Sequence, residues 1–425
     1  MIEAQTAQTP DRRLAPRPLP AHLTSAAGLW LSSSAALPLW KFVSPLWSEP
    51  GRRLRALAQE IEAFGVEQVG AALDAEIAHR TRAYIDGLEA YRRHPYRRGA
   101  AEVPVRWQEG TTRLLDYSVT EAGPAVLIIP SLVNRYYVLD LLPERSFLRH
   151  LAGHRLRPMV VDWGEPGPTE NGLGLGGHIR RLERAFAAAM RLAGRPLAVI
   201  GYCMGGLLAL ALALRRHQQV SSLVLLATPW DFHAGRETQA RLLGVLGDWL
   251  SPSDFAALPV EFVQGLFFVL DPFLGQRKFV RFAGLDQTGE AARSFVALED
   301  WINDGVPLPI AVARECLRSW YGDNAPGRGL WEAAGTRVCP QQLHRPALVV
   351  IPARDKIVPP ASAAALAAVL PASEALRPAL GHIGMMSAVQ APEMLWTPIA
   401  EWLTARFDTA TPRPRRRLDS SRARS

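Results

Sequence analysis

The sequence predicts an α/β fold, built on a mostly parallel sheet with helices on both faces. Three short apolar runs, 125–130, 197–202 and 346–352, have the pattern of strands that are buried on both faces. Each run ends in a segment that contains glycine or polar residues, and an Ala/Leu-rich helical run follows the second one at 206–215. In open sheets of this kind, functional groups gather at the carboxyl ends of the strands.

The turn after the second strand is the most informative segment. It consists of Gly201, Tyr202, Cys203, Met204 and Gly205, the G-x-S-x-G pattern of a nucleophile elbow with cysteine in place of serine. The glycines are needed because side chains two positions before and after the nucleophile would collide with the neighbouring strand and helix. The helix N-terminus behind the turn favours a thiolate over a thiol. The alternative is a buried cysteine in a glycine-rich turn.

An acid and a histidine follow in the chain order that such a nucleophile uses. Asp355 comes directly after the strand 346–352, and His382 lies 27 residues further on in a loop flanked by glycines. We expect Cys203 to be the nucleophile, His382 its general base and Asp355 the group that fixes the imidazole tautomer. A turn or helix-capping role for Asp355 and a plain loop role for His382 are the alternatives.

Two backbone donors are expected to form an oxyanion hole. The first is the N–H of Met204, the residue after the nucleophile. The second is the N–H of Val133, or of the residue before it, in the loop after the strand 125–130.

Side chains near these loops are candidates for substrate contacts: Asn134, Arg135, Tyr202, Trp230 and His233. Arg135 has an alternative role as the partner of an acid such as Asp140 or Glu144, and His233 has an alternative capping or surface role. The glycine-rich segment 172–177 does not directly follow a strand, so we do not expect it to bind a dinucleotide.

The chain resembles the catalytic domain of the polyhydroxyalkanoate synthases. The resemblance covers roughly 125–405 and rests on segments in the family's order and spacing: 129–140, 143–146, 161–166, 201–206, 228–232, 298–302, 355–359 and 381–384. It implies the α/β-hydrolase fold and gives Cys203, Asp355 and His382 the catalytic roles of that family. The chain departs from the family at Lys356, where histidine is usual, and in its first 120 residues or so.

The resemblance implies an acyltransferase that polymerises 3-hydroxyacyl-CoA into a polyester and releases CoA. Attack of a thiolate on a thioester exchanges one sulfur for another, so the acyl group stays activated on Cys203 until a hydroxyl attacks it. No cofactor is expected, because the CoA thioester is itself the substrate. The alternatives are an acyl-CoA thioesterase or intracellular polyester depolymerase on the same fold, and a granule-associated protein without turnover.

We expect four parts in the chain. They are an N-terminal helical segment at 1–110, partly disordered at 1–20; a catalytic core at 111–230 and 336–408; a lid at 231–335; and a disordered basic tail at 409–425. The lid is expected because its interval exceeds an ordinary loop and is rich in aromatic residues, although these residues could simply pack with one another. Within the first part, 53–93 has the periodicity of amphipathic helices.

The composition is that of an ordinary globular protein, with 425 residues, 48% hydrophobic and 21% charged. Three cysteines without paired spacing favour free thiols and a reducing, cytoplasmic compartment. Residues 409–425 hold six arginines and one aspartate, hence +5 of the formal net charge of +8. We expect this tail to be solvated, with no nucleic acid as partner, and we see no metal-ligand spacing.

The segment 25–42 is apolar but interrupted by serines and a proline, so it is a weak signal peptide and too short to span a membrane. Five of its side chains either pack against the main domain or face a polyester granule: Trp30, Leu31, Leu37, Trp40 and Phe42. The resemblance also implies a homodimer or a partner subunit as possible assemblies.

Overall fold

The computed structural model describes residues 13, 16–37, 49–99, 102–120, 123–251 and 256–410. Trp40, Phe42, the first twelve residues and most of the predicted basic tail lie outside these ranges. The chain divides into two compact units. The first comprises Met1–Ala100 and Pro259–Pro307, and the second Ala101–Leu258 and Leu308–Ser425.

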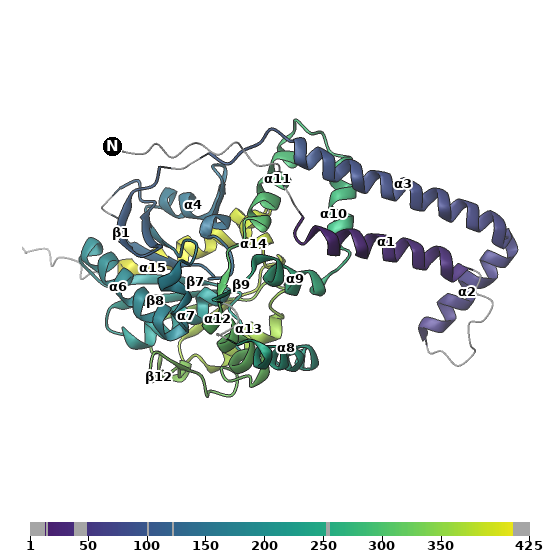
Figure 1. Cartoon of the computed structure of the whole chain (residues 1–425). Coiled ribbons are helices and arrows are strands. Elements are labelled where there is room, and N and C mark those ends of the chain that lie inside the picture. Colours follow the sequence, from purple (N-terminus) through teal and green to yellow (C-terminus); the bar gives the residue numbers. More distant parts are fainter. Residues whose placement is uncertain are drawn as a thin grey trace, which may run out of the picture. The chain divides into compact units, whose positions relative to one another are not determined.

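The second unit is built on an eight-stranded sheet in the order β1-β2-β6-β3-β7-β8-β13-β14 (Figure 1). In that order the strands are Val105–Glu109, Thr112–Asp116, Arg157–Asp162, Ala125–Ile129, Leu197–Tyr202, Val220–Leu226, Ala347–Val350 and Ser373–Leu376. All neighbours from β6 to β14 pair in parallel, whereas β1 and β2 form an antiparallel edge. The predicted mostly parallel sheet is therefore confirmed.

Helices surround this sheet (Figure 1). They are α4 (Phe147–Gly153), α5 (Pro168–Asn171), α6 (Leu175–Ala193), α7 (Met204–Arg215), α8 (Glu237–Trp249), α12 (Ile310–Glu315), α13 (Pro360–Val369), α14 (Gly384–Ser387) and α15 (Thr397–Ala410). A 3₁₀ turn, η2 (Tyr136–Leu139), and two π-helical turns, η3 (Cys316–Gly322) and η5 (Pro392–Trp396), interrupt the regular elements. Residues 204–213 of α7 are all buried, which explains why this helix is apolar on every face.

Three short antiparallel pairs complete the second unit. They are β4 (Asp140–Leu142) with β5 (Arg145–Ser146), β9 (Ala257–Leu258) with β10 (Leu308–Pro309), and β11 (Glu332–Ala333) with β12 (Thr336–Arg337). The glycine-rich segment 172–177 follows α5 and leads into α6.

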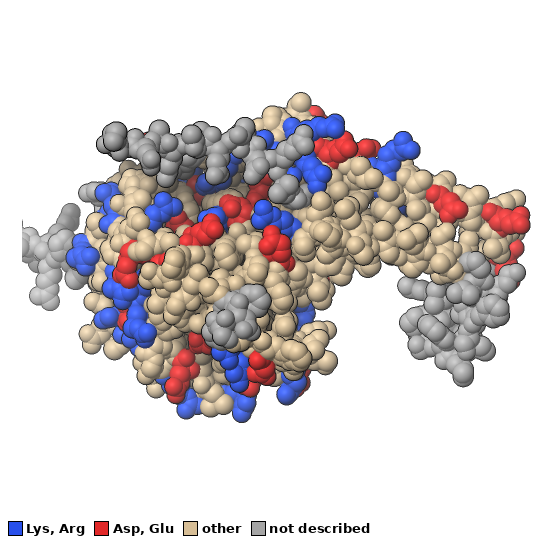
Figure 2. Space-filling model, in the orientation of Figure 1, with Lys and Arg blue, Asp and Glu red and all other residues tan. Residues whose placement is uncertain are grey.

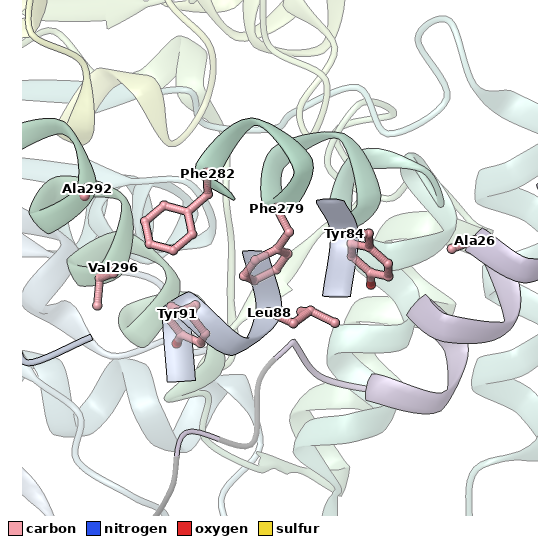
Figure 3. Packing of buried hydrophobic residues seen from close by; sticks show 8 residues of the cluster. All are labelled: Ala26, Tyr84, Leu88, Tyr91, Phe279, Phe282, Ala292 and Val296. Atoms are coloured by element: carbon pink, nitrogen blue, oxygen red, sulfur yellow. The ribbon is translucent and has the colours of Figure 1, made fainter. Parts of the chain in front are cut away.

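The first unit is helical. It contains α1 (Leu19–Ala36), α2 (Glu49–Phe64), α3 (Val66–Arg93), α9 (Val260–Leu270), α10 (Leu274–Ala283) and α11 (Glu290–Asn303). Its core joins α1, α3, α10 and α11 through eight buried side chains (Figure 3): Ala26, Tyr84, Leu88, Tyr91, Phe279, Phe282, Ala292 and Val296. Gly87 allows α3 and α10 to touch, because a Cβ there would lie 2.1 Å from the Phe279 carbonyl oxygen.

A buried arginine ties the ends of two of these helices together. Arg13 Nε donates to Asp300 Oδ1 over 2.7 Å, and its Nη1 donates to the His94 carbonyl oxygen over 2.6 Å. Tyr91 also donates its hydroxyl to Asp300 Oδ1 over 2.7 Å. The residues that follow α3 are thereby fixed to α11.

The compact units differ from the predicted parts. The predicted lid, 231–335, is divided: 259–307 belongs with the N-terminal helices, whereas 231–258 and 308–335 belong to the unit that contains the sheet. The physical reason is the aromatic packing of α10 and α11 on α3, which pairs residues about 200 positions apart and leaves no local signal in the sequence.

The predicted apolar N-terminal side chains divide between core and surface. Trp30 packs edge-on against Tyr84 with ring centroids 6.4 Å apart, whereas Leu31 is 72% exposed.

Among the described residues, no helix combines the length and apolarity that crossing a bilayer would require. Basic and acidic side chains are intermixed over the face shown in Figure 2.

Candidate active site

The elbow has the strand, sharp turn and helix that the sequence predicts. Cys203 stands between β7 and α7 with φ +57° and ψ −126°, a strained conformation for a residue with a side chain. The turn is held on both sides, because Cys203 N donates to the Leu226 carbonyl oxygen over 2.8 Å and Gly206 N donates to the Cys203 carbonyl oxygen over 2.9 Å. Cys203 is a partly exposed residue.

Close backbone contacts explain the glycines around Cys203. A Cβ at Gly201 would lie 2.4 Å from Gly206 Cα, and a Cβ at Gly205 would lie 2.2 Å from the Ile129 carbonyl oxygen. These are distances that real Cβ atoms do not show. The collision predicted from the sequence is therefore present at both positions.

Asp355 and His382 form a buried hydrogen-bonded pair beside the elbow. Asp355 follows β13, and His382 lies between β14 and α14. His382 Nδ1–H donates to Asp355 Oδ2 over 2.7 Å, and Asp355 Oδ1 accepts from the backbone N–H groups of Ile357 and Val358, both over 2.8 Å. Because Nδ1 is used in this way, Nε2 is the ring nitrogen left for a second partner.

The surroundings of His382 favour its protonated form. Burial alone would lower the pKa of the imidazole, but the charge of Cys203, the hydrogen bonds with Asp355 and Cys203, and the charge of Asp355 together raise the pKa to about 10. A negative charge on Cys203 would therefore be compensated by a protonated His382.

Tyr202 lies against His382. Its ring stacks on the imidazole with centroids 5.3 Å apart and an interplanar angle of 28°, and its hydroxyl donates to the His382 carbonyl oxygen over 3.2 Å. Burial, followed by the charges of Cys203 and Asp355, raises the pKa of the phenol well above its usual range. The sequence suggests Tyr202 for substrate contact, whereas its contacts in the structure are with the histidine.

The two predicted oxyanion donors differ in their surroundings. Met204 is the first residue of α7, where backbone N–H groups have no partner within the helix. Val133 N, in contrast, donates to Ser131 Oγ over 3.1 Å within its own loop. Leu132, the other residue that the sequence suggests here, is therefore the better candidate for the second donor.

The remaining predicted substrate contacts lie around the same loops. Arg135 pairs with Glu165 over 3.1 Å, and the side-chain oxygen of Asn134 is buried without a hydrogen-bond partner. Trp230 is buried, with its backbone N–H donating to Ser362 Oγ over 3.2 Å. The Nε2 atom of His233 is 2.8 Å from the Tyr321 carbonyl oxygen, so that ring nitrogen is already occupied.

Tyr321, on η3, is a site residue that sequence reasoning missed. Burial, and after it the charge of Cys203, raises the pKa of its phenol, so the phenol lies within electrostatic range of Cys203. Its ring lies edge-on to Phe232 with centroids 4.9 Å apart. No local pattern could identify it, because it lies 118 residues after Cys203 and its direction depends on a π-helical turn.

An asparagine fastens the segment of Tyr321 to the loop after β8. Asn324 Oδ1 accepts from Phe232 N over 2.9 Å, and its Nδ2 donates to Asp231 Oδ1 over 2.8 Å.

Across the described ranges, no group of three or more His, Cys, Asp or Glu side chains is arranged to hold a metal ion.

Comparisons with known proteins identify the fold family and its relatives. The family model described as alpha/beta hydrolase fold matches residues 124–388, which is more than half of the chain. The poly(3-hydroxyalkanoate) polymerase subunit PhaC of Haloferax mediterranei is 26% identical over 351 residues, covering 79% of this chain and 70% of the relative. The subunit of the same name from Allochromatium vinosum is 26% identical over 292 residues, covering 67% of this chain and 82% of the relative.

A solved structure of a thermophilic esterase from Thermogutta terrifontis is also similar, with a TM-score of 0.45 and 18% identity, over 73% of this chain and 99% of the other. The resemblance to polyhydroxyalkanoate synthases that the motifs indicate is confirmed over most of the chain. The chain belongs to the alpha/beta hydrolase fold family, and poly(3-hydroxyalkanoate) polymerases are among its relatives.

Proposed function

We propose that this protein is a polyhydroxyalkanoate synthase-like acyltransferase that uses Cys203, His382 and Asp355 as a catalytic triad. The observation that carries the proposal is the buried hydrogen bond between His382 and Asp355, beside an elbow that holds the partly exposed Cys203 in a strained turn. The relatives are named poly(3-hydroxyalkanoate) polymerases, and the resemblance of the motifs implies a 3-hydroxyacyl-CoA thioester as the substrate.

The first step transfers the acyl group to the enzyme. The Cys203 thiolate attacks the thioester carbonyl carbon, and the carbonyl oxygen becomes an oxyanion that accepts from the N–H groups of Met204 and Leu132. As the oxyanion collapses, the carbon–sulfur bond to CoA breaks and His382 gives its proton to the departing sulfur. An acyl-cysteine, free CoA and a neutral imidazole remain.

The charge change at Cys203 prepares His382 for the second step. The thiolate charge is the largest of the effects that raise the pKa of His382, and burial, the largest effect overall, acts in the opposite direction. Acylation removes the thiolate charge, so the pKa of His382 falls and the neutral imidazole can act as a base. It takes the proton of the 3-hydroxyl of another unit or of a growing chain.

That hydroxyl oxygen then attacks the acyl carbonyl carbon. The carbon–sulfur bond to Cys203 breaks, an ester bond forms, and the thiolate–imidazolium pair returns. Because one sulfur replaces another in the first step, the acyl group remains activated until this attack.

Aromatic side chains near Cys203 favour an alcohol over water as the acceptor. The ring of Phe232 lies 5.7 Å from that of Trp320 and 4.9 Å from that of Tyr321, and the charge of Cys203 raises the pKa of the Tyr321 phenol. We propose that these parts of 231–258 and 308–335 limit the access of water to the acyl-enzyme, as the predicted lid would.

Incubation of the purified protein with 3-hydroxybutyryl-CoA tests the function. We expect free thiol to be released and polyester to form. Release of free hydroxy acid without polymer would instead identify a thioesterase, and absence of thiol release would identify a protein without turnover. Cys203→Ala should abolish release, whereas Cys339→Ala, which removes another partly exposed thiol, should leave it unchanged.

A further inference from the structure

The residue directly before the nucleophile makes two separate contacts with the proposed base. Tyr202 ends β7, and its ring stacks on the His382 imidazole at 5.3 Å and 28°. Its hydroxyl donates to the backbone carbonyl oxygen of the same residue over 3.2 Å. Both side chains are buried, at 4% and 7% exposure, so these contacts are shielded from solvent.

We propose that Tyr202 is a positioning residue for His382, whose imidazole it holds beside Cys203 and Asp355 by ring stacking and by a hydrogen bond to the backbone. This inference rests on the proposed function, because it assumes that the Cys203–His382 pair is the reactive centre. The hydroxyl fixes the loop that carries His382, and the ring face fixes the plane of the imidazole.

The ring also contributes electrostatically. The face of an aromatic ring is negative, so a buried phenol beside an imidazolium stabilises the cation. Stabilising the imidazolium stabilises the thiolate–imidazolium pair relative to the neutral thiol and imidazole. The phenol itself stays neutral, since its surroundings disfavour the phenolate.

The charged and titratable groups around His382 all lie in the same site. Asp355 comes from the loop after β13, Cys203 from the elbow, and Tyr202 from the end of β7. The charge of Cys203 also raises the pKa of Tyr321, on η3. Because the charges of Cys203 and Asp355 act on Tyr202 as well, a comparison of rings of the same shape, rather than removal of the ring alone, assigns a shift to the stacking on His382.

The test is alkylation of Cys203 by iodoacetamide, followed by peptide mass spectrometry as a function of pH. Because only the thiolate reacts, the rate rises with pH around the midpoint at which half of Cys203 is thiolate. Tyr202→Leu removes the ring, and we expect the midpoint to rise by about 0.5 to 1 pH unit, the size of a desolvated cation–π contact. Tyr202→Phe keeps the ring and should produce a smaller rise.

Tyr117→Leu is the matched control, because Tyr117 is another buried tyrosine, whose hydroxyl donates a hydrogen bond to Asp140 over 2.9 Å. The midpoint of Cys203 alkylation in this variant should equal that of the wild type. If the leucine variant at position 202 does not fold, phenylalanine and pentafluorophenylalanine at that position provide the same comparison. The fluorinated ring keeps the shape but reverses the charge of its face. The midpoint of Cys203 alkylation should therefore be higher with pentafluorophenylalanine than with phenylalanine.

An unchanged midpoint in a folded Tyr202→Leu variant, or equal midpoints for the two phenylalanines, would overturn the proposal. Reduced thermal stability without a midpoint shift would indicate a structural role only. The assay needs no acyl-CoA, so a protein that fails to make polyester but shows the shift would contradict the proposed function and still support the role of Tyr202.

Discussion

Replacing Asp355 with asparagine should abolish most of the activity while leaving the fold nearly intact. In the wild-type protein, Oδ1 accepts from the N–H groups of Ile357 and Val358, and Oδ2 accepts from His382 Nδ1–H. An asparagine oxygen can replace Oδ1 in the first two bonds. The amide nitrogen would then face His382 Nδ1, and since it is a donor it would favour the wrong imidazole tautomer.

The size of the effect follows from these contacts. The wrong tautomer carries its hydrogen on Nε2 instead of Nδ1. The neutral ring therefore cannot accept a proton from Cys203 or from a substrate hydroxyl at Nε2. The corresponding change in a Ser-His-Asp enzyme costs about 10⁴-fold in kcat, and we expect a loss of about 10³- to 10⁴-fold here. Loss of the carboxylate charge also removes one of the effects that raise the pKa of His382.

The assay is CoA release from 3-hydroxybutyryl-CoA, together with thermal unfolding. We expect KM to change little and kcat to fall, with a melting temperature within a few degrees of the wild type. Asp86→Asn, which changes an exposed aspartate on α3, is the control and should change neither measurement. An Asp355→Asn variant with more than about a tenth of wild-type kcat would refute the reasoning, because a tautomer effect cannot be that small.

Three further predictions concern stability and packing. Gly205→Ala should be inactive and destabilised by several kcal/mol, because its Cβ would lie 2.2 Å from the Ile129 carbonyl oxygen. Urea denaturation measures the stability and CoA release measures the activity. A stable, active variant would contradict the elbow geometry. The folded-state pKa of His382 is about 10 and its unfolded value about 6.5, so its contribution to stability is fully present below pH 6.5 and is lost as the pH rises towards 10. The free energy of unfolding in urea should decline with pH in the wild type and decline less in His382→Gln. Parallel curves of this free energy against pH in the two proteins would contradict the prediction. Gly87→Ala should separate α3 from α10, since its Cβ meets the Phe279 carbonyl oxygen at 2.1 Å, and should lower the melting temperature, whereas Gly28→Ala, where a Cβ meets nothing within 4 Å, should not.

The sheet and the elbow were accessible from the sequence because their signals are local. Strands β3, β7 and β13 are buried on both faces, so each is a short apolar run with few alternatives. The glycines at 201 and 205 follow from the turn itself. Asp355 and His382 were accessible because the order of the residues and their place after strands both constrain them.

Long-range packing was not accessible in the same way. The grouping of 259–307 with the N-terminal helices depends on Phe279 and Phe282 meeting Tyr84 and Tyr91, and an aromatic run has the same pattern whichever partner it packs against. Tyr321 depends on a π-helical turn that no periodicity predicts. The hydrogen bond from Val133 N to Ser131 Oγ depends on the direction of one hydroxyl within its loop, which no sequence pattern predicts.

The most direct measurement of the central claim is detection of the acyl-enzyme. The protein is mixed with 3-hydroxybutyryl-CoA, quenched in acid within the first turnovers, digested, and examined by mass spectrometry. We predict that one 3-hydroxybutyryl group is attached to the peptide that contains Cys203, and that no such adduct forms in Cys203→Ala. Turnover without an adduct in the wild type, together with unchanged turnover in Cys203→Ala, would contradict the mechanism.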